Sequence, residues 1–146
     1  MLPVSGLLAL TDAALFTGAA IYVTVAEQPA RLKLDDSALL SEWKPSYKRG
    51  FAMQAPLALL GFLFGLMAWY ETGGIDFLVG ATLMIANWPW TLLAIMPTNN
   101  KLMATEPVAP NPEARALVVK WGWLHGVRSV LGGSATAVFF IACIAH

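Results

Sequence analysis

The segment 121–128 (WGWLHGVR) combines residue types that can do chemistry in an apolar setting. At about 100° per residue, Trp121, His125 and Arg128 fall on one face of a helix. Imidazole exchanges protons near neutral pH, and a guanidinium can stabilise an oxyanion. A charged side chain inside a spanning helix is costly and usually faces the bundle interior. This face therefore predicts either acid–base chemistry or a buried structural pair, for example between Arg128 and Glu27.

More polar and aromatic side chains lie near the ends of apolar segments that should meet this face. A carboxylate and two amides are among them, and each has a structural alternative: ion pairing for the acid and helix termination for the amides. Together they predict a polar, aromatic-lined pocket near the cytoplasmic face of a membrane. The set is Tyr22, Glu27, Tyr47, Gln54, Asn99 and Asn100.

The composition indicates which elements position these residues. The chain is 58% hydrophobic and 12% charged, whereas soluble domains carry about a quarter charged residues. Four apolar stretches, at about 4–26, 50–70, 75–96 and 117–145, are each near the length of roughly 20 residues that crosses a bilayer. The sequence therefore predicts an all-α, integral membrane four-helix bundle that forms one domain over residues 1–146.

Prolines and polar residues indicate where these helices begin and end. Pro29 is expected to stop the first helix. Residues 37–43 predict a short interfacial helix whose Leu39, Leu40 and Trp43 face lipid, followed by a new helix that starts at Pro45. Residues 97–100 (PTNN) are expected to close the third helix.

The distribution of Lys and Arg predicts the orientation of the bundle in the membrane, and the net charge excludes nucleic acid as a partner. Of the nine Lys and Arg residues, all but Arg128 lie in the connections 1–2 and 3–4 or at the start of the last helix. The positive-inside rule then places both connections in the cytoplasm and both termini on the non-cytoplasmic side, in a bacterial inner membrane. The formal net charge of zero gives no basic surface for nucleic acid. The bilayer itself is the expected environment.

Several cofactor sites are excluded by the residues present. A single internal histidine, His125, cannot supply two axial haem ligands, and no Cys, His and carboxylate set has the spacing of a metal site. The one cysteine, Cys143, cannot form an internal disulfide.

Four short motifs in chain order resemble the anthrone oxygenase-like family of small four-span membrane proteins. The resemblance extends over nearly the whole chain. It implies an oxidoreductase that converts an apolar polycyclic, phenolic substrate with O₂, without flavin, metal or other cofactor. The motifs are Gly18…Tyr22…Glu27-x-Pro29, Trp43-x3-Tyr47-x-Arg49, Pro97-Thr98-Asn99-x2-Leu102 and Trp121-x3-His125-x2-Arg128.

The resemblance also implies roles for the candidate residues. His125 or Glu27 would be the base, Arg128 with Asn99 or Asn100 would stabilise the developing oxyanion, and Trp121 would stack on the rings. Tyr22, Tyr47 and Gln54 would contact the substrate. The alternative is a non-enzymatic protein: a membrane accessory subunit, or a binder of a lipid or quinone-like molecule. A homo-oligomer or a membrane partner subunit is compatible with either function.

Overall fold

The computed structural model describes residues 3–146, and all regular structure in that range is helical. Two π-turns, in which each N–H bonds the carbonyl five residues earlier, lie within otherwise α-helical segments. The elements are α1 (Val4–Tyr22), the π-turn η1 (Val23–Glu27), α2 (Gln28–Arg31), α3 (Asp36–Thr72), α4 (Ile75–Trp90), the π-turn η2 (Thr91–Ile95), α5 (Met96–Ala104) and α6 (Pro112–Ala145).

These elements join into four continuous helical rods. They are Val4–Arg31, Asp36–Thr72, Ile75–Ala104 and Pro112–Ala145, and each is long and apolar enough to cross a membrane. The rods pack in the cyclic order α1, α3, α4, α6, with few contacts across the diagonals. The protein is therefore an integral membrane four-helix bundle, as its composition predicted.

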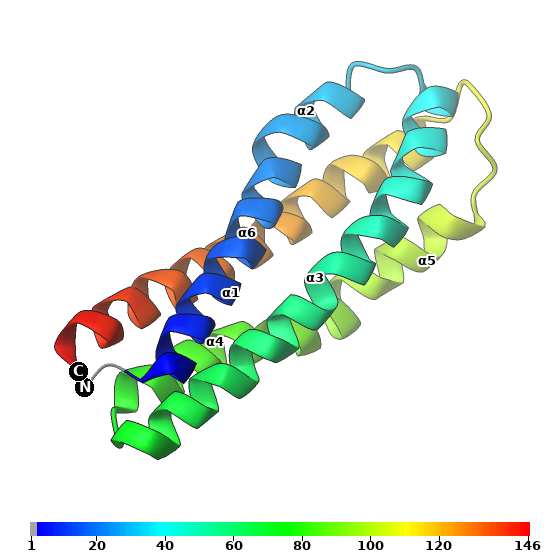
Figure 1. The fold of residues 1–146 in the computed structure, drawn as a ribbon. Helices are drawn as coiled ribbons and strands as arrows, with labels where there is room; N and C mark the ends of the chain where they lie inside the picture. Colours follow the sequence, from blue (N-terminus) through cyan, green and yellow to red (C-terminus); the bar gives the residue numbers. More distant parts are fainter. Residues whose placement is uncertain (1–2) are drawn as a thin grey trace.

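The start of α1 and the end of α6 lie at one end of the bundle, beside the turn between α3 and α4 (Figure 1). The connections 32–35 and 105–111 lie together at the opposite end. This agrees with an even number of membrane crossings. Which end faces the cytoplasm stays a prediction from the Lys and Arg distribution.

The beginning of α3 differs from the expected interfacial helix. The helix starts after Asp35, whose carboxylate accepts two first-turn backbone N–H groups at 3.0 Å, and it runs without interruption through Pro45. Leu39, Leu40 and Trp43 do not face lipid, because all three are fully buried against α5 and α6. The first turns of α3 thus form part of the bundle.

The expected helix ends at Pro29 and at 97–100 are also wrong, and both errors have the same physical cause. A proline has no N–H for the helical ladder and crowds the carbonyl four residues back. Here the backbone N–H of the residue before each proline bonds the carbonyl five residues earlier. The N–H of Gln28 bonds Val23 O, and that of Met96 bonds Thr91 O. The π-turns therefore accommodate Pro29 and Pro97 within the helices, and both helices continue beyond these prolines.

Candidate functional site

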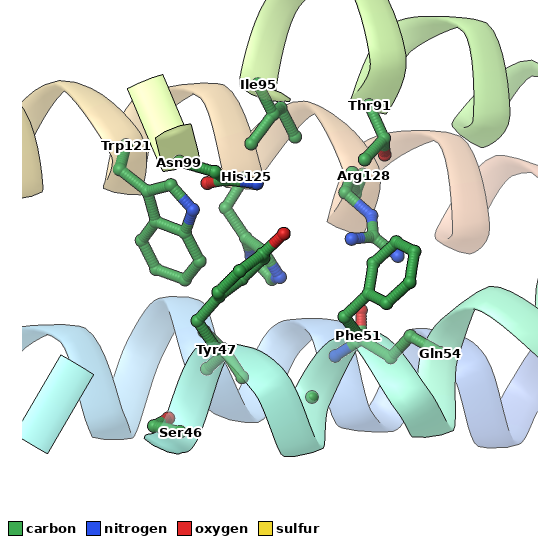
Figure 2. Close-up of a pocket in the computed structure, with 12 residues that line it drawn as sticks. Ser46, Tyr47, Phe51, Gln54, Thr91, Ile95, Asn99, Trp121, His125 and Arg128 are labelled. Carbon is green, nitrogen blue, oxygen red and sulfur yellow. The ribbon is translucent and has the colours of Figure 1, made fainter. Parts of the chain in front are cut away.

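A central pocket lies between the four rods in the half of the bundle that contains both π-turns. Its volume is about 30 Å³. Figure 2 shows side chains of α3 directed toward those of α6 across this space. Every rod contributes to the lining, which comprises Val23, Ser46, Tyr47, Gly50, Phe51, Gln54, Thr91, Ile95, Asn99, Trp121, His125 and Arg128.

Most of the polar residues predicted from the sequence meet in this pocket. The predicted face of α6 does point inward: Trp121, His125 and Arg128 are all buried and all line it. Gln54 of α3 and Asn99 of α5 are each only 1% exposed and line the same space. Tyr47 completes the set, with its hydroxyl 3.8 Å from the Met96 sulfur.

Glu27, Tyr22 and Asn100 do not line the central pocket. Asn100 is exposed, because adjacent helical residues point about 100° apart and Asn99 takes the inward direction. Tyr22 is 62% exposed. The π-turn η1 adds one residue to its helical turn, so Gln28 rather than Glu27 reaches the bundle interior, where its amide donates to Val118 O at 2.9 Å.

Glu27 belongs instead to an ion-pair cluster around Arg31. The Arg31 guanidinium binds Glu27, which also accepts from Ser46, and Arg31 Nε lies 2.8 Å from Glu42 Oε2. Arg31 is only 2% exposed, and its Cζ lies 5.5 Å from the Trp121 ring centroid. Ion pairing was thus a correct alternative for Glu27, but its partner is Arg31, four residues along the same helix, rather than Arg128.

Arg128 has no such partner. Within residues 3–146 it makes no hydrogen bond or ion pair, and the expected pair with Glu27 is absent because Arg31 occupies that carboxylate. Its closest recorded interaction is with Phe16, whose ring centroid lies 5.4 Å from Arg128 Cζ. A buried guanidinium with unused donors is available to a ligand.

Other buried polar atoms in the pocket also lack partners among the described residues. Nearly all buried polar groups in proteins are hydrogen-bonded, so a cluster of exceptions requires a reason. A ligand that supplies both donors and acceptors would satisfy them. They are Gln54 Oε1, Asn99 Oδ1 and Nδ2, Trp121 Nε1 and Arg128 Nε.

The contacts of His125 determine which of its ring nitrogens is free. Its Nδ1 lies 3.4 Å from the hydroxyl of Thr24. That hydroxyl also lies 3.0 Å from Ala20 O and 3.0 Å from Ser129 Oγ, so it can either donate to Nδ1 or accept from it. Nε2 has no partner within residues 3–146, and in the neutral tautomer with its proton on Nδ1 this nitrogen presents a lone pair.

Two further cavities adjoin the central pocket. The first, here called the lateral groove, lies between the end of α1 and α3, has a volume of about 420 Å³ and includes Tyr22, Glu27 and Arg49 in its lining. It shares Gly50 with the central pocket, and a Cβ added at Gly50 would meet no atom within 4 Å. The second, here called the side cavity, has a volume of about 10 Å³ and lies between α3 and the α4–η2 segment.

No metal centre is evident in the described part of the chain. Residues 3–146 contain no group of three or more His, Cys, Asp or Glu side chains that could hold a metal ion.

Comparison with known proteins agrees with the motifs. The family model described as anthrone oxygenase matches residues 43–138. A protein of Claviceps purpurea named anthrone oxygenase is 29% identical over 84% of this chain and 79% of its own length. Anthrone oxygenase tpcL of Aspergillus fumigatus is 37% identical over 64% of this chain and 63% of its own length. Anthrone oxygenase AgnL2 of Paecilomyces divaricatus is 27% identical over 84% of this chain and 85% of its own length. No solved structure matches the chain.

These relatives are fungal proteins, so they give no support to the expected bacterial inner membrane. The four apolar rods support an integral membrane location. The family model extends over more than half of the sequence and includes the inward face of α6. This chain belongs to the anthrone oxygenase family.

Proposed function

We propose that this protein oxidises an anthrone-type substrate, an apolar polycyclic phenol with a ring ketone, to the corresponding quinone with O₂. The curated relatives bear the name anthrone oxygenase. The observation that carries the proposal is the convergence of His125, whose Nε2 is free, with the unpartnered Arg128 and Asn99 in one buried pocket.

The first step of the proposed reaction is proton removal. His125 Nε2 takes a proton from the CH₂ carbon opposite the ring ketone. The electron pair left behind spreads through the aromatic rings onto the ketone oxygen, which becomes negatively charged. Arg128 and the Asn99 Nδ2 group can donate hydrogen bonds to that oxygen, and in a water-poor site such bonds stabilise charge strongly.

The second step is the reaction with O₂. The carbanion forms a C–O bond and gives a hydroperoxide after protonation by the His125 imidazolium. Loss of water then leaves a second ketone, so the balance is R₂CH₂ + O₂ → R₂CO + H₂O. All electrons come from the substrate, and the proposal therefore includes independence from flavin and metal.

The size of the cavities indicates where the ring system lies. Pockets for drug-sized ligands usually measure roughly 300–1,000 Å³. The central pocket, at about 30 Å³, is too small, whereas the lateral groove has about 420 Å³. We place the rings in the groove, with the reacting edge entering past Gly50 toward His125 and Trp121.

Oxygen uptake and quinone absorbance, measured with purified protein and a simple anthrone, test the proposal. The wild type should exceed the background rate, and His125→Ala should lose about 10²–10⁴-fold in rate, the usual contribution of a general base. His146→Ala is the matched control, because this other histidine lies against Phe77, beside the α3–α4 turn and away from the pocket.

Chelator-treated protein free of flavin should keep its rate. Wild-type protein that does not exceed the background would overturn the proposal, and so would His125→Ala with wild-type activity. Tight binding of the anthrone without turnover would identify a binding protein instead of an enzyme.

A further inference from the structure

The side cavity adjoins the central pocket but extends in a different direction from the lateral groove. It shares Phe51, Thr91 and Arg128 with the central pocket. From there it continues about two helical turns along α3, to Ala55 and Ala58, away from the end with the 32–35 and 105–111 connections. A molecule in the side cavity would thus be next to the reacting edge of a substrate without overlapping its rings.

The size and the α3 wall of the side cavity suit a very small apolar molecule. Its volume of about 10 Å³ is at the lower limit of the roughly 10–15 Å³ that one water molecule needs, so the cavity has no room for a substrate ring. Its α3 side consists of the Phe51 ring and the methyl groups of Ala55 and Ala58. Dioxygen is a non-polar diatomic molecule that dissolves better in hydrocarbon than in water.

The opposite side of the cavity contains hydrogen-bond donors. Trp88 and Arg128 line it, and Trp88 Nε1 and Arg128 Nε are buried without partners in the described residues. Asn87 Oδ1, from another lining residue, is also unpartnered. Donors at this position would stabilise negative charge that develops there. Reduction of O₂ by a carbanion creates such a charge on the distal oxygen.

We propose that the side cavity is the dioxygen site, supplied from the membrane between α3 and α4 and separate from the substrate groove. Leu92, which lines the cavity and is 51% exposed, lies at its membrane side. The inference depends on the proposed function. In the step that it describes, the carbanion's electron pair forms the C–O bond, and one electron pair of the O=O bond moves to the distal oxygen. Trp88 and Arg128 donate to that oxygen until His125 returns the proton.

The first test needs no turnover and so separates this inference from the proposed function. Protein with ¹³C-labelled alanine methyl groups is studied by NMR under nitrogen and under oxygen, because dissolved O₂ is paramagnetic and accelerates relaxation nearby. Ala58, which is 1% exposed, should relax faster under oxygen than Ala13 and Ala135, which are equally shielded from lipid at 0% exposure. Equal relaxation at the three methyl groups would overturn the inference.

The second test measures steady-state kinetics at varied O₂ and varied anthrone. Ala55→Leu should fill the side cavity and raise KM for O₂ several-fold while KM for the anthrone stays unchanged. Ala52→Leu, on the exposed face of the same helix, is the matched control and should change neither. Leu92→Trp at the membrane side is the second variant should Ala55→Leu fail to fold. A KM for O₂ that neither cavity variant raises would overturn the inference.

Discussion

At the end of the bundle that carries both termini, phenylalanine rings lie directly on glycine backbones, whereas the other half encloses a pocket. A Cβ added at Gly65 would lie 2.8 Å from Phe139 Cζ, and one at Gly132 would lie 2.7 Å from Phe16 Cδ1. At Gly50, in the pocket half, an added Cβ would meet no atom within 4 Å. Glycine therefore permits close helix packing in the first half, whereas in the second half Gly50 leaves space and Gly122 packs closely against Gln28.

Polar groups divide between the two halves in the same way. The packed half is a cluster of alanine, phenylalanine and methionine in which Asp12, 7% exposed, is the buried acid. The pocket half contains the Arg31 cluster and most of the unpartnered donors and acceptors, with Asp12 Oδ2 as an exception in the packed half. Because helices in lipid associate mainly through close packing, the first half can supply the stability that allows the second to keep an open polar site.

Removing a ring from the packed half should have the largest effect on stability. Phe139→Ala would leave a cavity between α3, α4 and α6, and comparable truncations cost about 3–5 kcal/mol. A large fall in Tm in detergent is expected. Phe140→Ala is the matched control, because the adjacent ring is 56% exposed and faces lipid. Equal Tm values for the two variants would contradict the assignment of this half as the packed core.

Adding side-chain volume should affect the two halves differently. Gly80→Val would force a side chain against the Phe139 ring, and overpacking costs about 1–3 kcal/mol. Gly50→Val should keep the wild-type Tm but narrow the passage from the lateral groove, so it should weaken anthrone binding. The measurements are Tm from thermal unfolding and the Kd for the anthrone from a binding titration, each made on both variants. A destabilised Gly50→Val protein would show that the pocket half is as tightly packed as the other.

Arg128→Met should change stability least. A buried charge without an ion-pair partner contributes a desolvation cost and no compensating bond, so Tm should stay equal to or rise above the wild-type value. Anthrone oxidation should nevertheless be lost, since the oxyanion would lose its charged donor. If Tm falls as far as in Phe139→Ala, Arg128 has a structural partner and the proposed role is wrong.

The helical period predicted part of the site correctly. The inward face of α6 follows from 3.6 residues per turn, because Trp121, His125 and Arg128 sit on an uninterrupted helix. Glu27 was expected in the pocket from its place at the end of the first apolar segment, but η1 inserts one residue into the turn that carries it, and Gln28 faces the interior instead. A proline in sequence indicates a helix end or a local rearrangement equally well, and only the packed bundle decides between them.

The burial of the residues at the start of α3 could not be predicted from the sequence either, and the reason is different. Leu39 and Trp43 have the apolar pattern of an interfacial helix, and local sequence does not show whether lipid or protein covers them. The structure places Trp43 edge-on to Trp121, with ring centroids 5.7 Å apart. Besides Tyr47, which stacks on it one turn along the same helix, its neighbours include Trp121 of α6, far away in the chain.

The sequence by itself determined the number of membrane-spanning rods, the residues of the inward face of α6 and the family motifs, because hydropathy and helical period are local properties. Tertiary structure decided which carboxylate meets which guanidinium: Glu27 binds Arg31, and Arg128 stays without a partner. It also decided that the space divides into a groove, a central pocket and a side cavity. These features depend on the rotation and register of packed helices, which the two π-turns shift by a residue each.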